Sequence, residues 1–258
     1  MALHDELKVS GPLSIFPLPS TVFYPKTLLP LHVFEPRYRE MTADALKGNK
    51  LIGMVLLRPG WEEHYFENPE ILSVGCVGTI DRSTLLEDGK YNIILRGLSR
   101  FRIVAELRGK SYRRAEVEFL KNSHDQPLAG GGPPGATGPS RIADGGPLSA
   151  RKARHIGSSG PLSGQHPLIE RYRNYCARLP KKLREKHRLD FDDCETLGEA
   201  ADRVAYQFDL NLGQKQSFLE ELDVRNRTKT ILSLIELKTG IINLSKSHLR
   251  EGFDARSN

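Results

Sequence analysis

Segments within the first 120 residues of the chain alternate between apolar and polar positions with a period of two. Over residues 112–119, Ala115 and Val117 fall on one face of an extended segment, and Glu116 and Glu118 fall on the other. This alternation is typical of a half-buried β-strand. Strands are also predicted at 14–19, 51–57, 74–81, 91–96 and 101–106, the last two joined by a turn at 97–99. Six or more short strands with few helices predict a barrel or a sandwich.

A helical spacing of apolar residues occurs once within this strand-rich part and again near the C-terminus. Pro36 suits a first helical turn and Gly48 suits a helix end, so we expect a helix between them. From Leu168 the apolar period becomes helical, and Pro180 should end the first of these helices. Residues 196–199 have the spacing of a capping box at the start of another helix. Three or four such helices predict a small bundle.

Between these two parts, residues 122–167 contain 10 Gly and 7 Pro in 46 positions and no aromatic residue. Such a composition buries too little apolar surface to offset the loss of chain entropy on folding. We therefore expect an α+β chain with three parts. These are a mostly antiparallel β domain over 10–121, a disordered linker over 122–167, and a helical subdomain over 168–250.

Charge and cysteine content narrow the classes of protein further. The net charge is +6, with 38 basic and 32 acidic residues, which is a mild attraction for nucleic acid. Three cysteines, far apart in the sequence, favour neither a disulfide framework nor a CxxC zinc site. The longest apolar run is far shorter than the roughly 20 residues of a membrane span. We expect a cytoplasmic protein without a membrane partner.

Sequence motifs for catalysis are fragmentary. Gly109-Lys110-Ser111 ends like a phosphate loop, but Val104 stands where the loop needs glycine. The acidic residues around Asp192 precede a predicted helix, where solvated carboxylates are favourable without any metal. We therefore expect no enzyme activity, no metal site and no small-molecule cofactor.

The most informative stretch is a proline-interrupted apolar segment over 16–39. It reads Phe-Pro-Leu-Pro at 16–19, Val-Phe-Tyr-Pro at 22–25 and Leu-Pro-Leu-His-Val-Phe-Glu-Pro-Arg-Tyr-Arg at 29–39. Five prolines make it stiff and extended, which suits an edge strand or a crossover rather than a central strand. Later landmarks are Val-Gly-Cys-Val-Gly-Thr-Ile at 74–80, Leu-Arg-Gly-Leu-Ser-Arg-Phe-Arg-Ile at 95–103 and Gly-Gln-Lys-Gln at 213–216.

In these motifs, taken in order, the chain resembles the N-terminal substrate-binding domain of Lon-type ATP-dependent proteases, over 12–120 and 168–244. The loop at 58–62 looks more like a stand-alone bacterial form of that domain. The resemblance implies a PUA-like β-pseudobarrel followed by a helical subdomain. It also implies a non-catalytic module that binds unfolded or degron-bearing polypeptide in protein quality control, with a Lon-type protease as a candidate partner. The alternative is an RNA-binding PUA-like module, because the chain is basic.

Two groups of residues are candidates for the site. Four large side chains lie close together in one charged loop: Trp61, His64, Tyr65 and Phe66. Aromatic residues are enriched at interaction surfaces. The loop is therefore either a contact surface or a lid packed on the barrel. Six residues of the matched motifs are expected to have structural roles: Phe34, Glu35, Arg37, Tyr38, Arg39 and Arg100. Charged strand residues such as Arg100 are expected on the solvated outer face.

Overall fold

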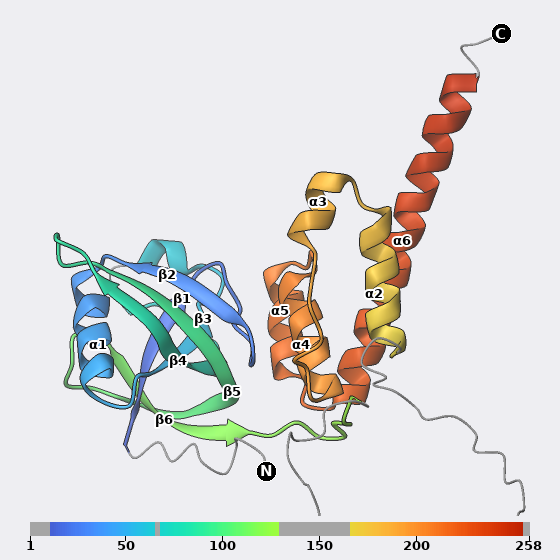
Figure 1. Cartoon of the computed structure of the whole chain (residues 1–258). Coiled ribbons are helices and arrows are strands. Elements are labelled where there is room, and N and C mark those ends of the chain that lie inside the picture. Colours follow the sequence, from blue (N-terminus) through green and yellow to red (C-terminus); the bar gives the residue numbers. More distant parts are fainter. Residues whose placement is uncertain (1–10, 65–67, 129–165, 255–258) are drawn as a thin grey trace, which may run out of the picture.

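A computed structural model describes residues 11–64, 68–128 and 166–254 (Figure 1). One six-stranded mixed sheet forms the first half, in the order β2-β5-β4-β3-β1-β6. Its strands are β1 (Leu13–Leu18), β2 (Leu28–Val33), β3 (Leu51–Leu56), β4 (Val74–Leu85), β5 (Tyr91–Leu107) and β6 (Arg113–Leu120). Strand β5 also pairs with β6, so the sheet curls round on itself. Only the β1–β3 pair is parallel; the other described pairs are antiparallel.

Strand β5 differs from the prediction of two strands joined by a turn, because it runs without a break for 17 residues. Gly97 does not turn the chain; it lets the backbone at Tyr24 approach β5. A Cβ atom at Gly97 would lie 2.0 Å from the Tyr24 carbonyl oxygen. The proline-interrupted segment forms the end of β1, where Pro17 pairs with Val55 of β3, and the whole of β2. Among the described strands, β2 pairs with β5 alone. Pro30, which has no N–H to donate, is thus tolerated at the edge of the sheet.

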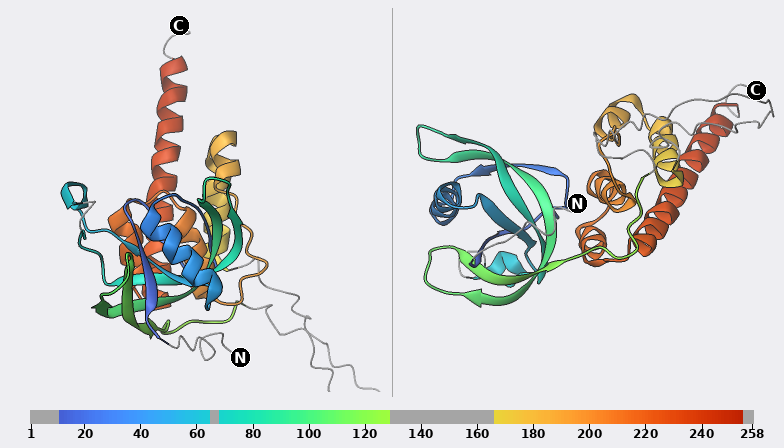
Figure 2. Two further views of the ribbon diagram at one scale, coloured as in Figure 1. Left: turned by 90° about the vertical axis from the view of Figure 1, so that its left-hand side faces the viewer. Right: turned by 60° about the horizontal axis from the view of Figure 1, so that its bottom comes forward.

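Helix α1 (Pro36–Lys47) covers the side of the sheet that faces away from the C-terminal helices (Figures 1 and 2). It begins with Pro36 and ends at Gly48, as predicted. Its inner face buries Tyr38, Met41 and Ala45, and the Tyr38 ring stacks on Phe16 with centroids 4.2 Å apart.

Five helices form the described second half (Figure 1): α2 (Pro167–Arg178), α3 (Lys181–Lys186), α4 (Leu197–Gln207), α5 (Leu212–Glu220) and α6 (Val224–Asp254). The Thr196 hydroxyl accepts from the Glu199 N–H, as a cap should, but the Glu199 carboxylate reaches the N–H of Glu195 instead of that of Thr196. A complete capping box occurs at α5, between Asn211 and Gln214. The upper part of α6 extends beyond the other helices (Figure 1). None of the described helices is long and apolar enough to cross a membrane.

The start of the predicted linker is packed rather than free. The Leu128 side chain is 4% exposed, and its N–H donates to the Glu195 carbonyl. Ser123 likewise exchanges backbone hydrogen bonds with Leu222 and Val224. Residues 122–128, which follow β6, are therefore attached by hydrogen bonds to the start of α4 and to the start of α6. At the other end of the predicted linker, His166 caps α2 and Pro167 begins it. Residues 129–165 lie outside the described residues, and their disorder stays a prediction.

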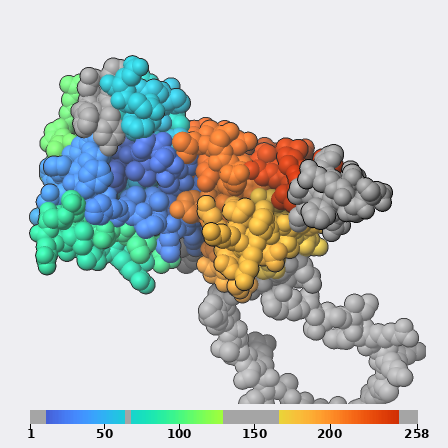
Figure 3. Space-filling model, turned by 90° about the horizontal axis from the view of Figure 1, so that it is seen from above, coloured from blue at the N-terminus to red at the C-terminus, as the bar shows by residue number. Residues whose placement is uncertain are grey.

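The strand half and the helical half share one hydrophobic core. Phe16, Tyr24 and Cys76 from the strand half belong to the same buried cluster as Tyr172 and Phe208 from the helical half. Figure 3 shows the helices, in yellow and orange, in contact with the strands, in blue. A smaller cluster around Phe101 fills the inside of the curled sheet.

Candidate functional site

A buried ion pair joins the two halves. Arg100, on β5, donates to both carboxylate oxygens of Asp202, on α4, at 2.8 and 2.6 Å. Its Nε also donates to the Leu219 carbonyl at 2.9 Å. Both charged side chains are 2% exposed. The expectation that Arg100 would lie on a solvated face is therefore wrong.

A second buried arginine completes this joint. Arg227, on α6, lies 3.3 Å from Asp202 and donates to the Asn122 side chain and to the Glu221 carbonyl. Burial lowers the pKa of Arg227, against the opposing attraction of Asp202. Burial acts in the same direction on Arg100, but there Asp202 more than offsets it and the pKa of Arg100 is raised. One carboxylate thus holds two arginines from different halves.

Further hydrogen bonds cross the joint around this pair. The Tyr24 hydroxyl donates to the Lys215 carbonyl at 2.5 Å, and the Gln216 amide donates to the Val74 carbonyl at 3.0 Å. Tyr206, on α4, donates to the Leu28 carbonyl on β2 at 3.1 Å. Such specific polar contacts fix the register between the halves. The surfaces on either side of the joint therefore keep one arrangement.

A groove with a volume of about 560 Å³ opens beside the joint. The loop at 20–22 forms one wall, and helices α2 to α5 form the other. Leu183 on α3 and Leu212 on α5 stand at its rim and are 45% and 36% exposed. Two lysines, Lys186 and Lys215, also line it. The exposed leucines can bind apolar side chains of a polypeptide, and the lysines beside them can bind its polar groups.

His187 follows α3 and lies between this groove and a second cavity. Burial lowers the pKa of its ring, and its Nδ1 has no hydrogen-bond partner among the described residues. The ring packs edge-on against Tyr175, with centroids 6.5 Å apart. Its backbone carbonyl accepts from the Tyr172 hydroxyl at 2.8 Å. The chain after α3 is thus held to α2 by backbone and ring contacts.

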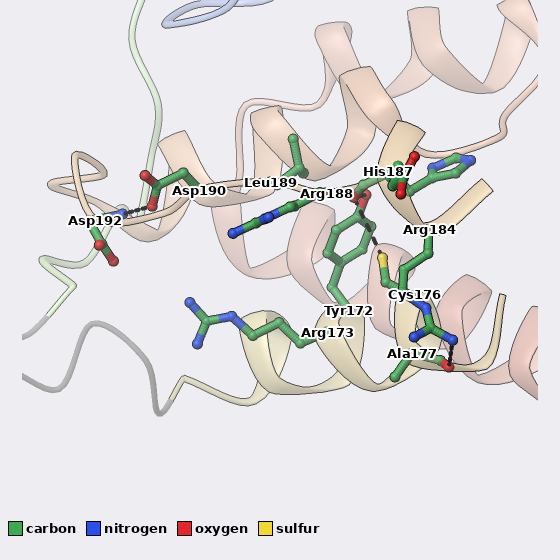
Figure 4. Close-up of a pocket in the computed structure, with 11 residues that line it drawn as sticks. Tyr172, Arg173, Cys176, Ala177, Arg184, His187, Arg188, Leu189, Asp190 and Asp192 are labelled. Carbon is green, nitrogen blue, oxygen red and sulfur yellow. Dashed lines mark hydrogen bonds between the residues drawn. The ribbon is translucent and has the colours of Figure 1, made fainter. Parts of the chain in front are cut away.

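The second cavity lies between α2, α3 and the segment that follows α3, and it has a volume of about 950 Å³ (Figure 4). Arg173 and Arg188 reach into its opening from α2 and from the segment after α3 (Figure 4). Arg184 is turned toward α2, where it donates to the carbonyls of Ala177 and Leu179. Three acidic residues also line this cavity: Glu185, Asp190 and Asp192.

Most of the residues that line this cavity come from a strongly basic segment of the chain. Residues 171–188 contain eight Lys or Arg and one acidic residue, so their net charge of +7 exceeds the +6 of the whole chain. All eight basic side chains are exposed. Sequence reasoning missed this segment, although a count of charge in short windows would have found it.

The predicted contact loop is only partly within the described residues. Trp61 is half-buried at the start of the short 3₁₀ helix η2 (Trp61–His64), beside Arg58 and Leu72. Tyr65 and Phe66 lie outside the described residues, as does the His64 side chain. The contact role of this loop stays a prediction, and its described residues line neither of the two cavities above.

The motif residues around α1 line neither of these two cavities and contact residues near them in the strand half. Glu35 precedes α1 and pairs with Arg37 at 2.9 Å, and the Arg37 guanidinium lies 4.7 Å from the centre of the Tyr38 ring. Arg39 lies against Gly89, in the turn between β4 and β5. Phe34 is 57% exposed and packs beside His32 on the outer face of β2.

Metal and thiol chemistry find little support in the described part of the chain. No group of three His, Cys, Asp or Glu residues lies close enough there to hold a metal ion. The three cysteines are buried and unpaired. Burial raises the pKa of Cys194 to about 11 and also raises that of Cys176 and Cys76, so all three stay protonated at neutral pH.

Comparison with known proteins places the chain in a family. A model of the ATP-dependent protease La (LON) substrate-binding domain matches residues 12–236, and the chain belongs to this family. A Lon protease of Dictyoglomus thermophilum is 25% identical over 246 residues, which are 93% of this chain and 27% of that protein. A Lon protease of Paraburkholderia phytofirmans is 28% identical, over 95% of this chain and 26% of that protein. The chain thus spans about a quarter of the length of these relatives.

Two solved structures share the fold. The crystal structure of a Lon N-terminal domain protein from Xanthomonas campestris matches with a TM-score of 0.54 and 20% identity, over 86% of this chain and 98% of that one. The N-terminal domain of a Mycobacterium avium complex Lon protease matches with a TM-score of 0.53 and 16% identity, over 88% and 98%. The fold is therefore that of a Lon N-terminal domain, with a strand half and a helical half.

Proposed function

We propose that the chain is a non-catalytic, cytoplasmic polypeptide-binding module that acts in protein quality control. Its clients are unfolded or degron-bearing polypeptides, and a Lon-type protease is its candidate partner. The matched family is a substrate-binding domain, which supports binding rather than chemistry. The raised pKa values of the buried thiols support the same conclusion, because a protonated thiol is a poor nucleophile. We also propose that the curled sheet is a PUA-like pseudobarrel.

The groove beside the joint carries this proposal. Leu183 and Leu212 keep large apolar surfaces in solvent, where a side chain gains nothing from folding alone. Both stand at the rim of a hollow that the strand half and the helical half build together. Because the buried Arg100–Asp202 pair fixes the two halves, the groove is preorganised and loses little entropy on binding.

An RNA-binding role has less support. Binding of single-stranded nucleic acid relies on aromatic rings that stack on bases. Tyr172, Tyr175 and Phe191 are rings next to the basic segment, and all three are buried. These three rings are therefore not accessible for stacking on bases, whereas the leucines and Lys186 that would bind a polypeptide are exposed.

The test is binding of a fluorescently labelled, permanently unfolded polypeptide, followed by anisotropy. Replacing Leu183 and Leu212 together by Asp should weaken binding by about thirtyfold, because hot-spot truncation costs about 2 kcal/mol or more. The matched control is Leu85→Asp, an exposed leucine on β4 that does not line the groove. Equal loss in both variants, or no binding by the unaltered chain, would refute the proposal.

The same assay tests the predicted contact loop. Trp61→Ala should weaken binding while changing the melting temperature by only a few degrees, because the side chain is half-buried. A large fall in melting temperature would make the loop a structural lid.

A further inference from the structure

Helix α3 is a wall shared by the apolar groove and the cavity of Figure 4. Leu183 and Lys186 line the groove, whereas Arg184 and Glu185 line the cavity on the other side. The segment after α3 adds Arg188 to the cavity, and α2 adds Arg173 from the opposite wall. An extended polypeptide seated in the groove would therefore lie within a few side-chain lengths of a dense field of positive charge.

Several of these cations lack an acidic partner within the part of the chain that the structure describes. Arg171 pairs with Glu236, and Arg184 is engaged by the carbonyls at the end of α2. By contrast, no carboxylate of the described residues lies within ion-pair distance of Arg173, Arg188 or Lys186. The guanidinium of Arg173 faces the Phe191 ring at 6.0 Å, which leaves its donors available.

The acidic residues that line the cavity offset only part of the charge of this region. With Asp190 and Asp192 included, residues 171–192 still have a net charge of +5. Over residues 171–188 the only acidic residue is Glu185, against eight cations. Concentrating seven net positive charges on 18 residues is unfavourable by itself, since like charges repel. An anionic partner removes that repulsion.

We propose that the clients of this module are acid-flanked apolar segments. The apolar residues occupy the groove between Leu183 and Leu212, and the acidic residues on either side contact Lys186, Arg173 and Arg188 on the basic face. This inference rests on the proposed polypeptide-binding function and adds the chemical class of the client. The continuity of the apolar groove with the basic face along α3 favours a polypeptide over nucleic acid, which has no apolar segment to place in the groove.

Two labelled peptides test the inference. They share one apolar core and differ in flanking residues, with glutamates in one and lysines in the other. The unaltered chain should bind the glutamate peptide about tenfold more tightly or better at low salt, because like charges across an interface are strongly unfavourable. The preference should shrink as salt rises toward about 0.3 M, since the basic side chains are exposed and screened.

Charge-reversal variants show which basic side chains cause the preference for the glutamate peptide. Arg173→Glu with Arg188→Glu should abolish or invert the preference, and Lys181→Glu with Lys182→Glu on α3 should reduce it; the second variant serves if the first does not fold. Arg82→Glu with Arg108→Glu, two exposed arginines of the strand half, is the matched control and should leave the preference intact.

The outcomes distinguish polypeptide binding in general from the preference for acid-flanked segments. Equal affinity for both peptides, with binding still sensitive to Leu183 and Leu212, would overturn the acid-flanked class and leave polypeptide binding standing. No binding of either peptide would overturn both. Binding of a single-stranded RNA 20-mer that is lost on Arg173→Glu with Arg188→Glu, without any peptide preference, would assign the basic face to nucleic acid and overturn the inference.

Discussion

Arg100 shows how much one side chain contributes to the arrangement of the molecule. Replacing it by Met would leave the Asp202 carboxylate buried with Arg227 and without its two hydrogen bonds from β5. Breaking a buried pair from one side costs about 3–5 kcal/mol. We therefore expect Arg100→Met to lower the melting temperature by roughly 10 °C, measured by circular dichroism.

The control for this variant is Arg96→Met on the same strand. Arg96 pairs with Asp81 at 3.1 Å but is half exposed, so its loss should cost less than about 1 kcal/mol. A similar, small change in both variants would show that the buried pair does not hold the halves together.

Asp223 gives a pH dependence whose sign follows from its partners. Its side chain accepts from the Arg225 side chain and backbone N–H at the start of α6, and His124 lies 3.0 Å away. The Arg225 hydrogen bonds lower the pKa of Asp223 from 3.8 to about 2. Because the folded pKa is depressed, the stabilisation is complete above about 4 and is lost as the pH falls toward 2.

We accordingly expect Asp223→Asn to melt below the unaltered chain at about pH 5, and the gap to close between about pH 4 and pH 2. Thermal melts at a series of pH values measure it. A gap that stays constant over this range would mean that the carboxylate charge is not what stabilises this helix start.

At the scale of elements, Gly198 in the first turn of α4 is required by its surroundings. Asp125 accepts from the Gly198 N–H at 2.8 Å and from the Thr196 hydroxyl at 3.1 Å. A Cβ atom at Gly198 would lie 2.5 Å from that Asp125 carboxylate. Gly198→Ala should therefore destabilise the protein by about 1–2 kcal/mol through loss of the cap, although alanine favours helices.

Gly240→Ala, in the middle of α6, is the control. A Cβ atom there meets no described atom within 4 Å, so this change should stabilise the protein by up to about 1 kcal/mol. Urea denaturation compares the two. Stabilisation by both substitutions would show that Asp125 does not cap α4.

Local patterns predicted most elements, and long-range contacts account for the exceptions. Alternation located β6, an apolar run of strand length located β3, and Pro36 and Gly48 bounded α1. The pattern divides β5 into two strands because Gly97 resembles a turn residue, and its true role is to admit a backbone from the loop before β2. Helix α3 was not predicted, since a short lysine-rich segment has almost no apolar period.

The candidate groove lay beyond sequence reasoning for a related cause. Its walls come from 20–22 and from positions between 175 and 215, which no local pattern can place together. Asn122 and Asp125 fall in the predicted linker because the residues after them are rich in glycine and proline, although their own side chains bind α4 and α6. The basic segment 171–188 was present in the sequence and needed only a count of charges.

At the scale of the whole molecule, the joint should hold the halves together without a covalent connection. A specific protease site placed between Gly145 and Gly146, in the segment whose composition predicts a linker, allows the test. After cleavage, we expect both fragments to elute together in size-exclusion chromatography, because the halves share one core and the Arg100–Asp202 pair. Fragments that elute separately would show that the described contacts are too weak to act alone.

The sequence separation between Arg100 and Asp202 also determines how long, during synthesis, Arg100 exists without its partner. The two residues stand 102 positions apart. A ribosome adds about 5 to 20 residues each second, so Asp202 emerges roughly 5 to 20 seconds after Arg100. During that interval the newly made sheet carries an uncompensated guanidinium on the surface that the helices will later cover. The shared core can close only after the helical half has been made, because residues from both halves belong to it.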